Sequence, residues 1–292
     1  MSAEWSSTLQ SKQPPDFLVI GHATRDVEDG FFRLGGTVTY AGLLGVRLGL
    51  QTAVVTSHGP DLPVPEALKG ASVSVRPSPA STTFRNRYDG SHRQQLISEV
   101  ASPLALEDVP DSWRRSRVVL LGPVAGELQP DLFTGFPDAL LGLTPQGLMR
   151  AWNEAGEVRA TLWEPPDELL SRLDVLVLSE DDLPDAAVLS HYTRRVPVVA
   201  VTHAERGATV YTADGARDYP AYACAPADPT GAGDVFAAAF LIELEASGDT
   251  AHAATFANSA ASFVIEAEGP SGVPDRHSIM QRISIGAYRT VS

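Results

Sequence analysis

Five short, largely apolar runs recur along the chain and restrict its fold more than any other feature. They cover residues 17–21 (FLVIG), 53–57 (AVVTS), 118–122 (VVLLG), 174–179 (DVLVLS) and 198–202 (VVAVT). Apolar runs without polar alternation are typical of parallel strands that are buried on both faces. Segments of helical length, such as 37–48 and 181–194, lie between the runs. This alternation predicts an α/β fold in which helices cover both faces of a parallel sheet, giving three layers.

Residues 82–98 depart from this pattern. Apolar and polar residues alternate there around Asp89-Gly90, a pair that is typical of a tight hairpin turn. A polar hairpin within a parallel α/β chain favours a small β lid over a part of the core. We interpret the arginines of this hairpin as solvated charges of the lid rather than as phosphate ligands: Arg85, Arg87 and Arg93.

The chain contains no internal repeat or linker, so we expect one large domain. The predicted divisions are a flexible leader over residues 1–16 and a single domain over residues 17–292, with a small lid from about 25–36 and 82–98. The leader is polar and lacks the apolar core of a signal peptide, which favours a cytoplasmic protein. The lid can cover its own site or pair across a dimer, so monomer and homodimer both stay open.

Charge and composition exclude several classes of partner. The net charge of -14 repels nucleic acids and anionic membranes, and the apolar run 235–242 is far shorter than the roughly 20 residues that span a bilayer. We therefore expect a small-molecule substrate and neither a nucleic-acid nor a membrane partner. The single cysteine, Cys224, excludes an internal disulfide and a multi-cysteine zinc site, and we interpret it as a packed small residue.

The scarcity of lysine is a sharper constraint. The chain has only two lysines, Lys12 in the leader and Lys69 in the segment LKGAS. Walker-type phosphate binding, protein-kinase chemistry and Schiff-base chemistry all need a lysine at the reacting centre. Neither lysine has such a setting, so these mechanisms are not expected.

The stretch DPTGAGDVFAAAF, residues 228–240, is the strongest candidate for a site. Small residues at 231–233 open an apolar helix, where free N–H groups and the helix dipole attract an anion. Asp234 follows at once, and it is either a stabiliser of the first helical turn or a base beside the anion site. The preceding DPT and the apolar character of the helix favour the second interpretation, phosphoryl transfer to a hydroxyl.

This stretch resembles the second signature of the ribokinase-like (PfkB-type) carbohydrate kinases. The resemblance extends over nearly the whole chain after residue 16, and it implies a ribokinase-like fold, ATP and Mg²⁺ as cofactors, and room for a monovalent cation. It also implies that Asp234 is the catalytic base and that the amides of Gly231, Ala232 and Gly233, with that of Asp234, form the anion hole.

Other segments fall in the order of the same family. FLVIGHATRDV and LGGTVTYAGLLGVRLG resemble the acceptor side, whereas VAVTHAERGATVY and FANSAASFVIEAEGPSGVP resemble the nucleotide side. The implied acceptor-binding residues are Asp26, Gly35, Gly36 and Tyr40; the implied nucleotide-binding residues are Ser179, Thr202, Gly207, Thr230, Asn258 and Gly269; and Asp182 is implied as a magnesium ligand through water.

The sequence departs from the family pattern at several positions. Tyr40 stands where the family usually has asparagine, and SEDD replaces the Asn-x-x-Glu motif, with Ser179 for Asn and Asp182 for Glu. Ala204 stands where glycine is frequent. These changes bear on substrate and rate more than on the class of reaction.

Two classes of function stay open. The first is an ATP-dependent kinase that phosphorylates a hydroxyl of a small sugar or polyol, with a faint resemblance to inositol kinases in NRYDG, LLGPVAGEL and TPQGLMRAW; a nucleoside is the alternative acceptor. The second is a catalytically weak, ligand-sensing relative on the same fold. The intact loop 231–234 favours the kinase, because a binding protein needs no base beside an anion hole.

Overall fold

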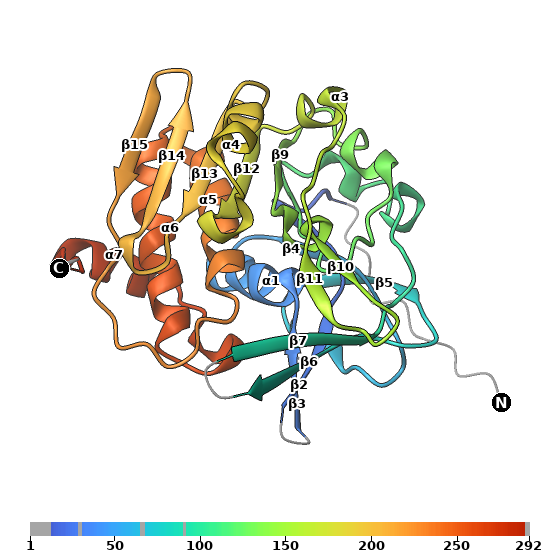
Figure 1. Ribbon diagram of the computed structural model, residues 1–292. Coiled ribbons are helices and arrows are strands. Elements are labelled where there is room, and N and C mark those ends of the chain that lie inside the picture. The colour runs from blue at the N-terminus through green and yellow to red at the C-terminus, as the bar shows by residue number, and fades with distance from the viewer. Residues whose placement is uncertain (1–12, 29–30, 65–67, 90–91, 290–292) are drawn as a thin grey trace.

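A nine-stranded sheet forms the centre of the protein (Figure 1). The computed structural model describes residues 13–28, 31–64, 68–89 and 92–289. The strand order is β15-β14-β13-β12-β9-β8-β1-β4-β5, and the pairs from β13 to β5 are all parallel. The parallel strands are β1 (Phe17–Ile20), β4 (Thr52–His58), β5 (Ser72–Pro77), β8 (Val118–Leu121), β9 (Leu140–Leu143), β12 (Val175–Ser179) and β13 (Val198–Thr202). An antiparallel pair, β14 (Ala208–Thr212) and β15 (Gly215–Tyr219), completes one edge.

The sheet separates two hydrophobic cores. In β1, Phe17 and Val19 enter one core and Leu18 and Ile20 enter the other, because successive side chains of a strand point to opposite faces. The first face is covered by α1 (Thr37–Arg47), α5 (Ala232–Ser247), α6 (Thr250–Ile265) and α7 (Arg276–Ile285). The second face is covered by the short helices α3 (Asp167–Leu170) and α4 (Ala186–Thr193) and by 3₁₀ turns. The predicted three-layer α/β fold is thereby confirmed.

One predicted helix is shorter than expected. Residues 181–194 were predicted as one helix, but α4 begins only at Ala186, and residues Glu180–Asp182 form a 3₁₀ turn, η5. Leu183 is extended (φ -103°, ψ 107°), as the residue before Pro184 tends to be. Asp185 then caps α4 by accepting hydrogen bonds from two N–H groups of its first turn.

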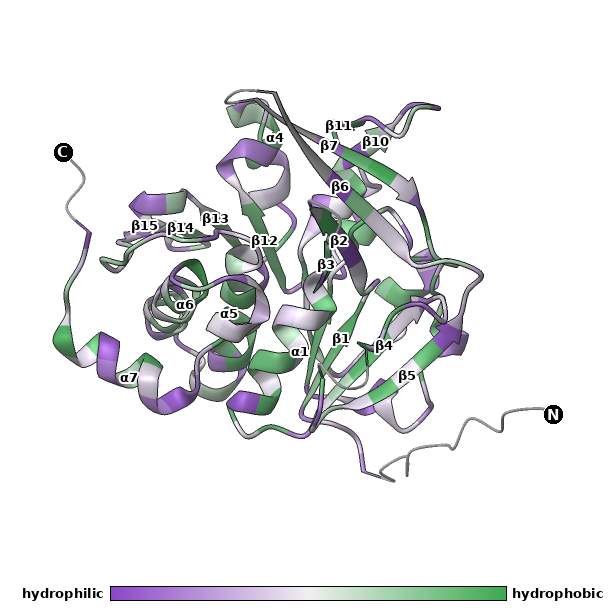
Figure 2. Ribbon diagram, turned by 90° about the horizontal axis from the view of Figure 1, so that it is seen from below, coloured by the Kyte–Doolittle hydropathy of each residue, from purple (hydrophilic) through white to green (hydrophobic). Residues whose placement is uncertain are grey.

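A separate four-stranded sheet, in the order β3-β2-β6-β7, contains the segments that were predicted as a lid, and we call it the lid sheet or lid. Its strands are β2 (Thr24–Glu28), β3 (Phe31–Gly35), β6 (Thr82–Asp89) and β7 (His92–Glu99). Figures 1 and 2 both place this sheet at one end of the α/β body, next to α1. The predicted turn residue Gly90 and the side chains of Arg87 and Arg93 lie outside the described part of the structure, whereas Arg85 is exposed.

His22 joins the lid to the central sheet. Its fully buried ring contacts the Thr82 hydroxyl (Nδ1···Oγ1 2.8 Å) and the Ser102 carbonyl (Nε2···O 2.9 Å). Its backbone N–H donates to the buried carboxylate of Glu127, which also accepts hydrogen bonds from Val124 and Ala125. The hydrogen bonds of His22 therefore hold the first residues of the lid strands β2 and β6 close to each other and to the central sheet.

The end of the predicted leader is bonded to the sheet. The N–H of Asp16 donates to the carbonyl of Gln51, and its carboxylate accepts from the N–H of that residue. Residues 1–12 of the predicted leader lie outside the described residues. None of the helices in the described ranges is both long and apolar enough to cross a bilayer.

Candidate active site

A cleft of about 870 Å³ lies between the lid and the carboxyl ends of the central strands. This is the edge at which open α/β sheets bind ligands, and the volume is in the range of small-molecule sites. The lid contributes Asp26, Arg33, Phe84 and Gln95, and the strand ends contribute Ser179 and Thr202. The amino ends of α1 and α5 complete the wall with Gly36, Thr37, Tyr40, Gly231, Gly233 and Asp234.

The start of α5 leaves room for a ligand. Gly231 has a left-handed backbone (φ 82°), and a Cβ at this position would lie 2.3 Å from the ring of Tyr40. Only glycine fits there, so the ring of Tyr40 packs on the loop itself. Gly233 is exposed, and a Cβ there would contact nothing within 4 Å. The N–H of Ala232 donates to the carbonyl of Pro229 (3.2 Å), so the open side of this first turn lies at Gly233.

Asp234 is a partly buried carboxylate with an unusual pKa. Burial raises its pKa from 3.8 to about 6. The hydroxyl of Thr37 donates to it (Oγ1···Oδ1 2.7 Å) and lowers the pKa, as does the charge of Arg150, whereas the charge of Asp26 raises it. A carboxylate of this kind can accept a proton near neutral pH.

The predicted acceptor-binding residues lie together. Asp26 of β2 accepts a hydrogen bond from the hydroxyl of Thr24 (3.0 Å). A Cβ at Gly35 would lie 2.2 Å from Asp26 Oδ2, so the glycine permits the close approach of this carboxylate. Tyr40 is only 2% exposed, and burial together with the charges of Asp26 and Asp234 raises its pKa.

Ser179 and Asp182 cap the 3₁₀ turn η5 at the opposite wall. Asp182 Oδ2 accepts a hydrogen bond from the Ser179 N–H (2.9 Å), and burial raises the pKa of Asp182. Asp181 also lines the cleft. Among the residues that the structure describes, no three His, Cys, Asp or Glu side chains gather into a metal site. The arrangement fits Mg²⁺, which binds through one or two carboxylates, water and substrate phosphates.

Three predicted nucleotide-side residues do not line the cleft. Asn258 is buried and donates through Nδ2 to the carbonyl of Tyr219 (3.0 Å). A Cβ at Gly207 would lie 2.1 Å from that same oxygen. Gly269 opens the 3₁₀ turn η7 (Gly269–Gly272), whose preceding residue, Glu268, does line the cleft. Thr230, the remaining predicted residue, lines the cleft at the loop before α5.

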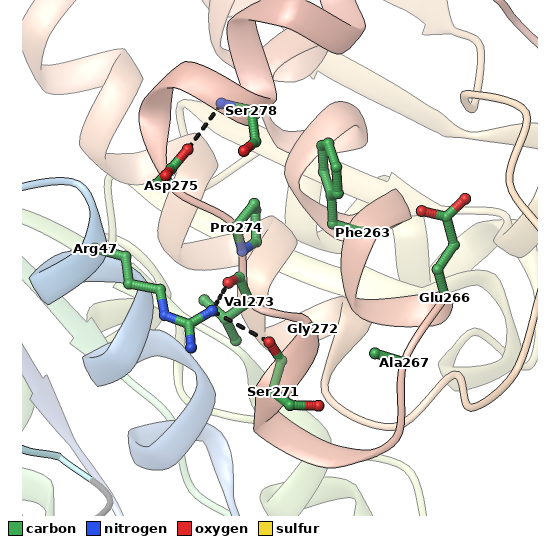
Figure 3. Close-up of a pocket in the computed structure, with 10 residues that line it drawn as sticks. All are labelled: Arg47, Phe263, Glu266, Ala267, Ser271, Gly272, Val273, Pro274, Asp275 and Ser278. Atoms are coloured by element: carbon green, nitrogen blue, oxygen red, sulfur yellow. Dashed lines mark hydrogen bonds between the residues drawn. The ribbon is translucent and has the colours of Figure 1, made fainter.

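An ion-pair cluster connects the lid with the nucleotide side. Arg33 of β3 contacts Asp228 (3.4 Å) and Glu268 (2.9 Å). A second hollow, of about 560 Å³, lies at η7 (Figure 3). There the guanidinium of Arg47 donates to the carbonyls of Ser271 and Val273 and holds the turn that carries Glu268.

The sequence analysis missed several residues that line the cleft. None of the group Arg33, Phe84, Gln95, Arg150, Asp228 and Glu268 was singled out as a site residue. Once the lining of the cleft is known, its balance of charged side chains indicates what kind of acceptor it can bind. The lining holds six carboxylates, Asp26, Asp181, Asp182, Asp228, Asp234 and Glu268, against two guanidiniums, Arg33 and Arg150. This balance disfavours an acceptor that already carries a negative charge.

Known proteins resemble this chain along most of its length. Residues 167–276 match the family model described as pfkB family carbohydrate kinase. A cytidine kinase of Thermococcus kodakarensis is 27% identical over 77% of this chain and 87% of its own length. A pyrophosphate-dependent kinase in the ribokinase family has a similar structure (TM-score 0.76, 23% identity, 91% of this chain and 99% of that one). Arabidopsis thaliana ribokinase, solved with ribose and ATP, is also similar (TM-score 0.72, 21% identity, 93% of this chain and 99% of that one).

Proposed function

We propose that this chain is a kinase of the ribokinase-like PfkB carbohydrate kinase family and that it transfers the γ-phosphoryl group of ATP to a hydroxyl of a small, uncharged sugar or polyol. The observation that carries the proposal is that a carboxylate and an anion-binding helix terminus lie side by side at the start of α5. A carboxylate with a pKa of about 6 lies directly beside an open, glycine-lined helix terminus.

The proposed reaction needs one proton acceptor and one anion site. The acceptor hydroxyl oxygen attacks the γ-phosphorus, its proton passes to the carboxylate of Asp234, and the bond between the γ-phosphorus and the bridging oxygen breaks to release ADP. The N–H groups on the open side of the loop 231–234, above all that of Gly233, stabilise the negative charge of the transferred group. A Mg²⁺ ion held by Asp182 through water would neutralise the charge of the donor phosphates.

The chemistry of the acceptor side favours an uncharged polyol. Asp26, Thr24 and Gln95 offer hydrogen-bond partners for several hydroxyls, and Phe84 offers an apolar wall for the carbon face of a ring. The excess of carboxylates works against phosphorylated or carboxylated acceptors. An inositol fits this class. A nucleoside is the alternative acceptor, because Phe84 can also stack on a base and one relative is a cytidine kinase.

A ligand-sensing protein without turnover is the weaker alternative. Binding alone does not need a carboxylate whose charge is disfavoured by burial, and such a group lowers stability at neutral pH. Catalysis of proton transfer does need it.

Pyrophosphate is a second candidate donor. Gly207, Asn258 and Gly269, which were predicted to bind the nucleotide, lie outside the lining of the cleft. The residues that do line it therefore favour contacts with the phosphates of a donor over contacts with a nucleotide base. A protein of similar fold is itself pyrophosphate-dependent.

A product assay tests these proposals. The purified protein is incubated with myo-inositol, neutral sugars, cytidine or ribose phosphates, each with ATP or pyrophosphate and Mg²⁺, and phosphorylated products are detected by mass spectrometry. We expect a phosphorylated neutral polyol that disappears in chelator and in Asp234→Asn. A protein that binds these compounds, seen by thermal shift, but forms no product with either donor would support the sensing alternative and refute the kinase.

A further inference from the structure

Arg150 is held in the cleft by two separate elements. It is the first residue of β10 (Arg150–Trp152) and follows the 3₁₀ turn η4 (Pro145–Met149). Its guanidinium lies over the ring of Phe84 on lid strand β6, 5.4 Å from the centroid. Its Nη1 donates to the carbonyl of Val124, in the loop after β8 (3.3 Å). The side chain is therefore oriented from both the lid and the body.

The same guanidinium lines the cleft together with both functional carboxylates, Asp234 and Asp182. Burial raises the pKa of Asp234, and the positive charge of Arg150 acts against this larger effect and lowers it. Arg150 thus brings a full positive charge to the cleft that the candidate base and the candidate metal carboxylate also line.

We infer that Arg150 binds the phosphoryl group during its transfer and stabilises the charge that spreads over its oxygens. The inference rests on the proposed kinase function and adds a residue to it. A helix terminus supplies only about half an elementary charge, whereas a guanidinium supplies a whole charge and a planar fork of donors that matches phosphate oxygens. An arginine in this role raises the rate of phosphoryl transfer by roughly 10³–10⁵-fold in other enzymes.

The test compares Arg150→Met with Arg150→Lys and Arg150→Ala. We expect Arg150→Met to lower kcat by at least about a hundredfold while the KM values for donor and acceptor change by less than about threefold. Arg150→Lys should retain part of the rate, because it keeps the charge but not the fork. Added guanidinium ion should restore part of the activity of Arg150→Ala. Arg159→Met, at an exposed arginine on the neighbouring strand β11 (Val158–Ala160), is the matched control and should behave as the wild type.

A pH profile gives a second readout. Asp234 faces Asp26 of β2, Tyr40 and Thr37 of α1, and Arg150. Removing the arginine should move the acid limb of kcat to higher pH, because the remaining charged neighbour, Asp26, disfavours the ionised base.

Three results would overturn the inference. They are an unchanged kcat in Arg150→Met, a rise confined to the acceptor KM, or a loss of rate that follows the loss of folded protein. Should Arg150→Met not fold, the rate and pH profile of Arg150→Lys decide the question in the same way. A wild-type protein that phosphorylates nothing would refute the kinase proposal itself. An active wild type together with an equally active Arg150→Met variant would refute only the role of Arg150.

Discussion

Replacing Asp234 by asparagine should remove activity and at the same time stabilise the fold. The substitution keeps the size of the side chain, and the amide oxygen can still accept the hydrogen bond from Thr37. It removes the negative charge that burial disfavours. As the proposed base, Asp234 should contribute roughly 10²–10⁴-fold to kcat, and that factor should be lost.

The gain in stability follows from the pKa. Raising the pKa of Asp234 from 3.8 to about 6 corresponds to roughly 3 kcal/mol for keeping the group ionised in the folded protein. Because the side chain is only partly buried, we expect about 1–3 kcal/mol of added unfolding free energy in Asp234→Asn above pH 7.

The sign of the pH dependence is fixed by linkage. Between about pH 4 and pH 6 the folded protein binds a proton that the unfolded chain has already released, so this group lowers stability as the pH rises. The difference between variant and wild type should be near zero at about pH 4 and should reach its plateau above the folded pKa.

Denaturant titrations of both proteins at about pH 4.5, 6 and 7.5 measure this difference. Asp214→Asn, at an exposed carboxylate between β14 and β15, is the control and should show no such rise. A variant that is equally stable at all three pH values, or that keeps most of its turnover per folded molecule, would refute the reasoning.

Substitutions at three further positions test the site and its surroundings. Asp26→Ala should raise the acceptor KM by roughly tenfold to a hundredfold and leave the donor KM unchanged, because it removes a charged hydrogen-bond partner; steady-state kinetics measure this. Gly35→Ala should have the same selective effect on the acceptor KM, since its methyl group would overlap Asp26 Oδ2. Ala204 is exposed with a left-handed backbone (φ 48°), so Ala204→Val should be less stable than Ala204→Gly by at least about 1 kcal/mol in denaturant titrations.

Each of these has a result that would contradict it. Equal losses of donor and acceptor affinity in Asp26→Ala or Gly35→Ala would show that the whole cleft has been distorted. Equal stability of the two Ala204 variants would show that the backbone at this position relaxes without strain.

Much of the fold could be predicted because it depends on local patterns. The runs at 17–21, 53–57, 118–122, 174–179 and 198–202 match β1, β4, β8, β12 and β13. Their uninterrupted apolar character reflects burial on both faces, which is a property of neighbouring residues. The loop 231–234 could also be predicted from the sequence. Its glycine at Gly231 is required by a left-handed backbone angle and by the nearby ring of Tyr40.

Features that depend on distant contacts could not be predicted in this way. Strand β9 has four residues, and the order of the sheet places it between β8 and β12. Arg150 lies in the stretch TPQGLMRAW, but the sequence assigned it no role, and its place in the cleft arises only when η4 brings it against Phe84, which lies 66 positions earlier. Asn258 and Gly207 fitted a pattern, yet both meet at the carbonyl of Tyr219 rather than in the lining of the cleft.

The ion pairs of Arg33 have a consequence for the order of events in turnover. Strand β3 belongs to the lid sheet, whereas Asp228 precedes α5 and Glu268 precedes η7, so a lid that opens would have to break both pairs. The pair of Arg33 with Glu268 is exposed, whereas Asp228 is only 18% exposed, so salt screens the first pair more strongly than the second. Ionic strength should therefore act on entry and release rather than on bond formation. If release limits turnover, as in many enzymes whose lids close on the substrate, moderate salt should accelerate steady-state cycling while leaving the first turnover unchanged.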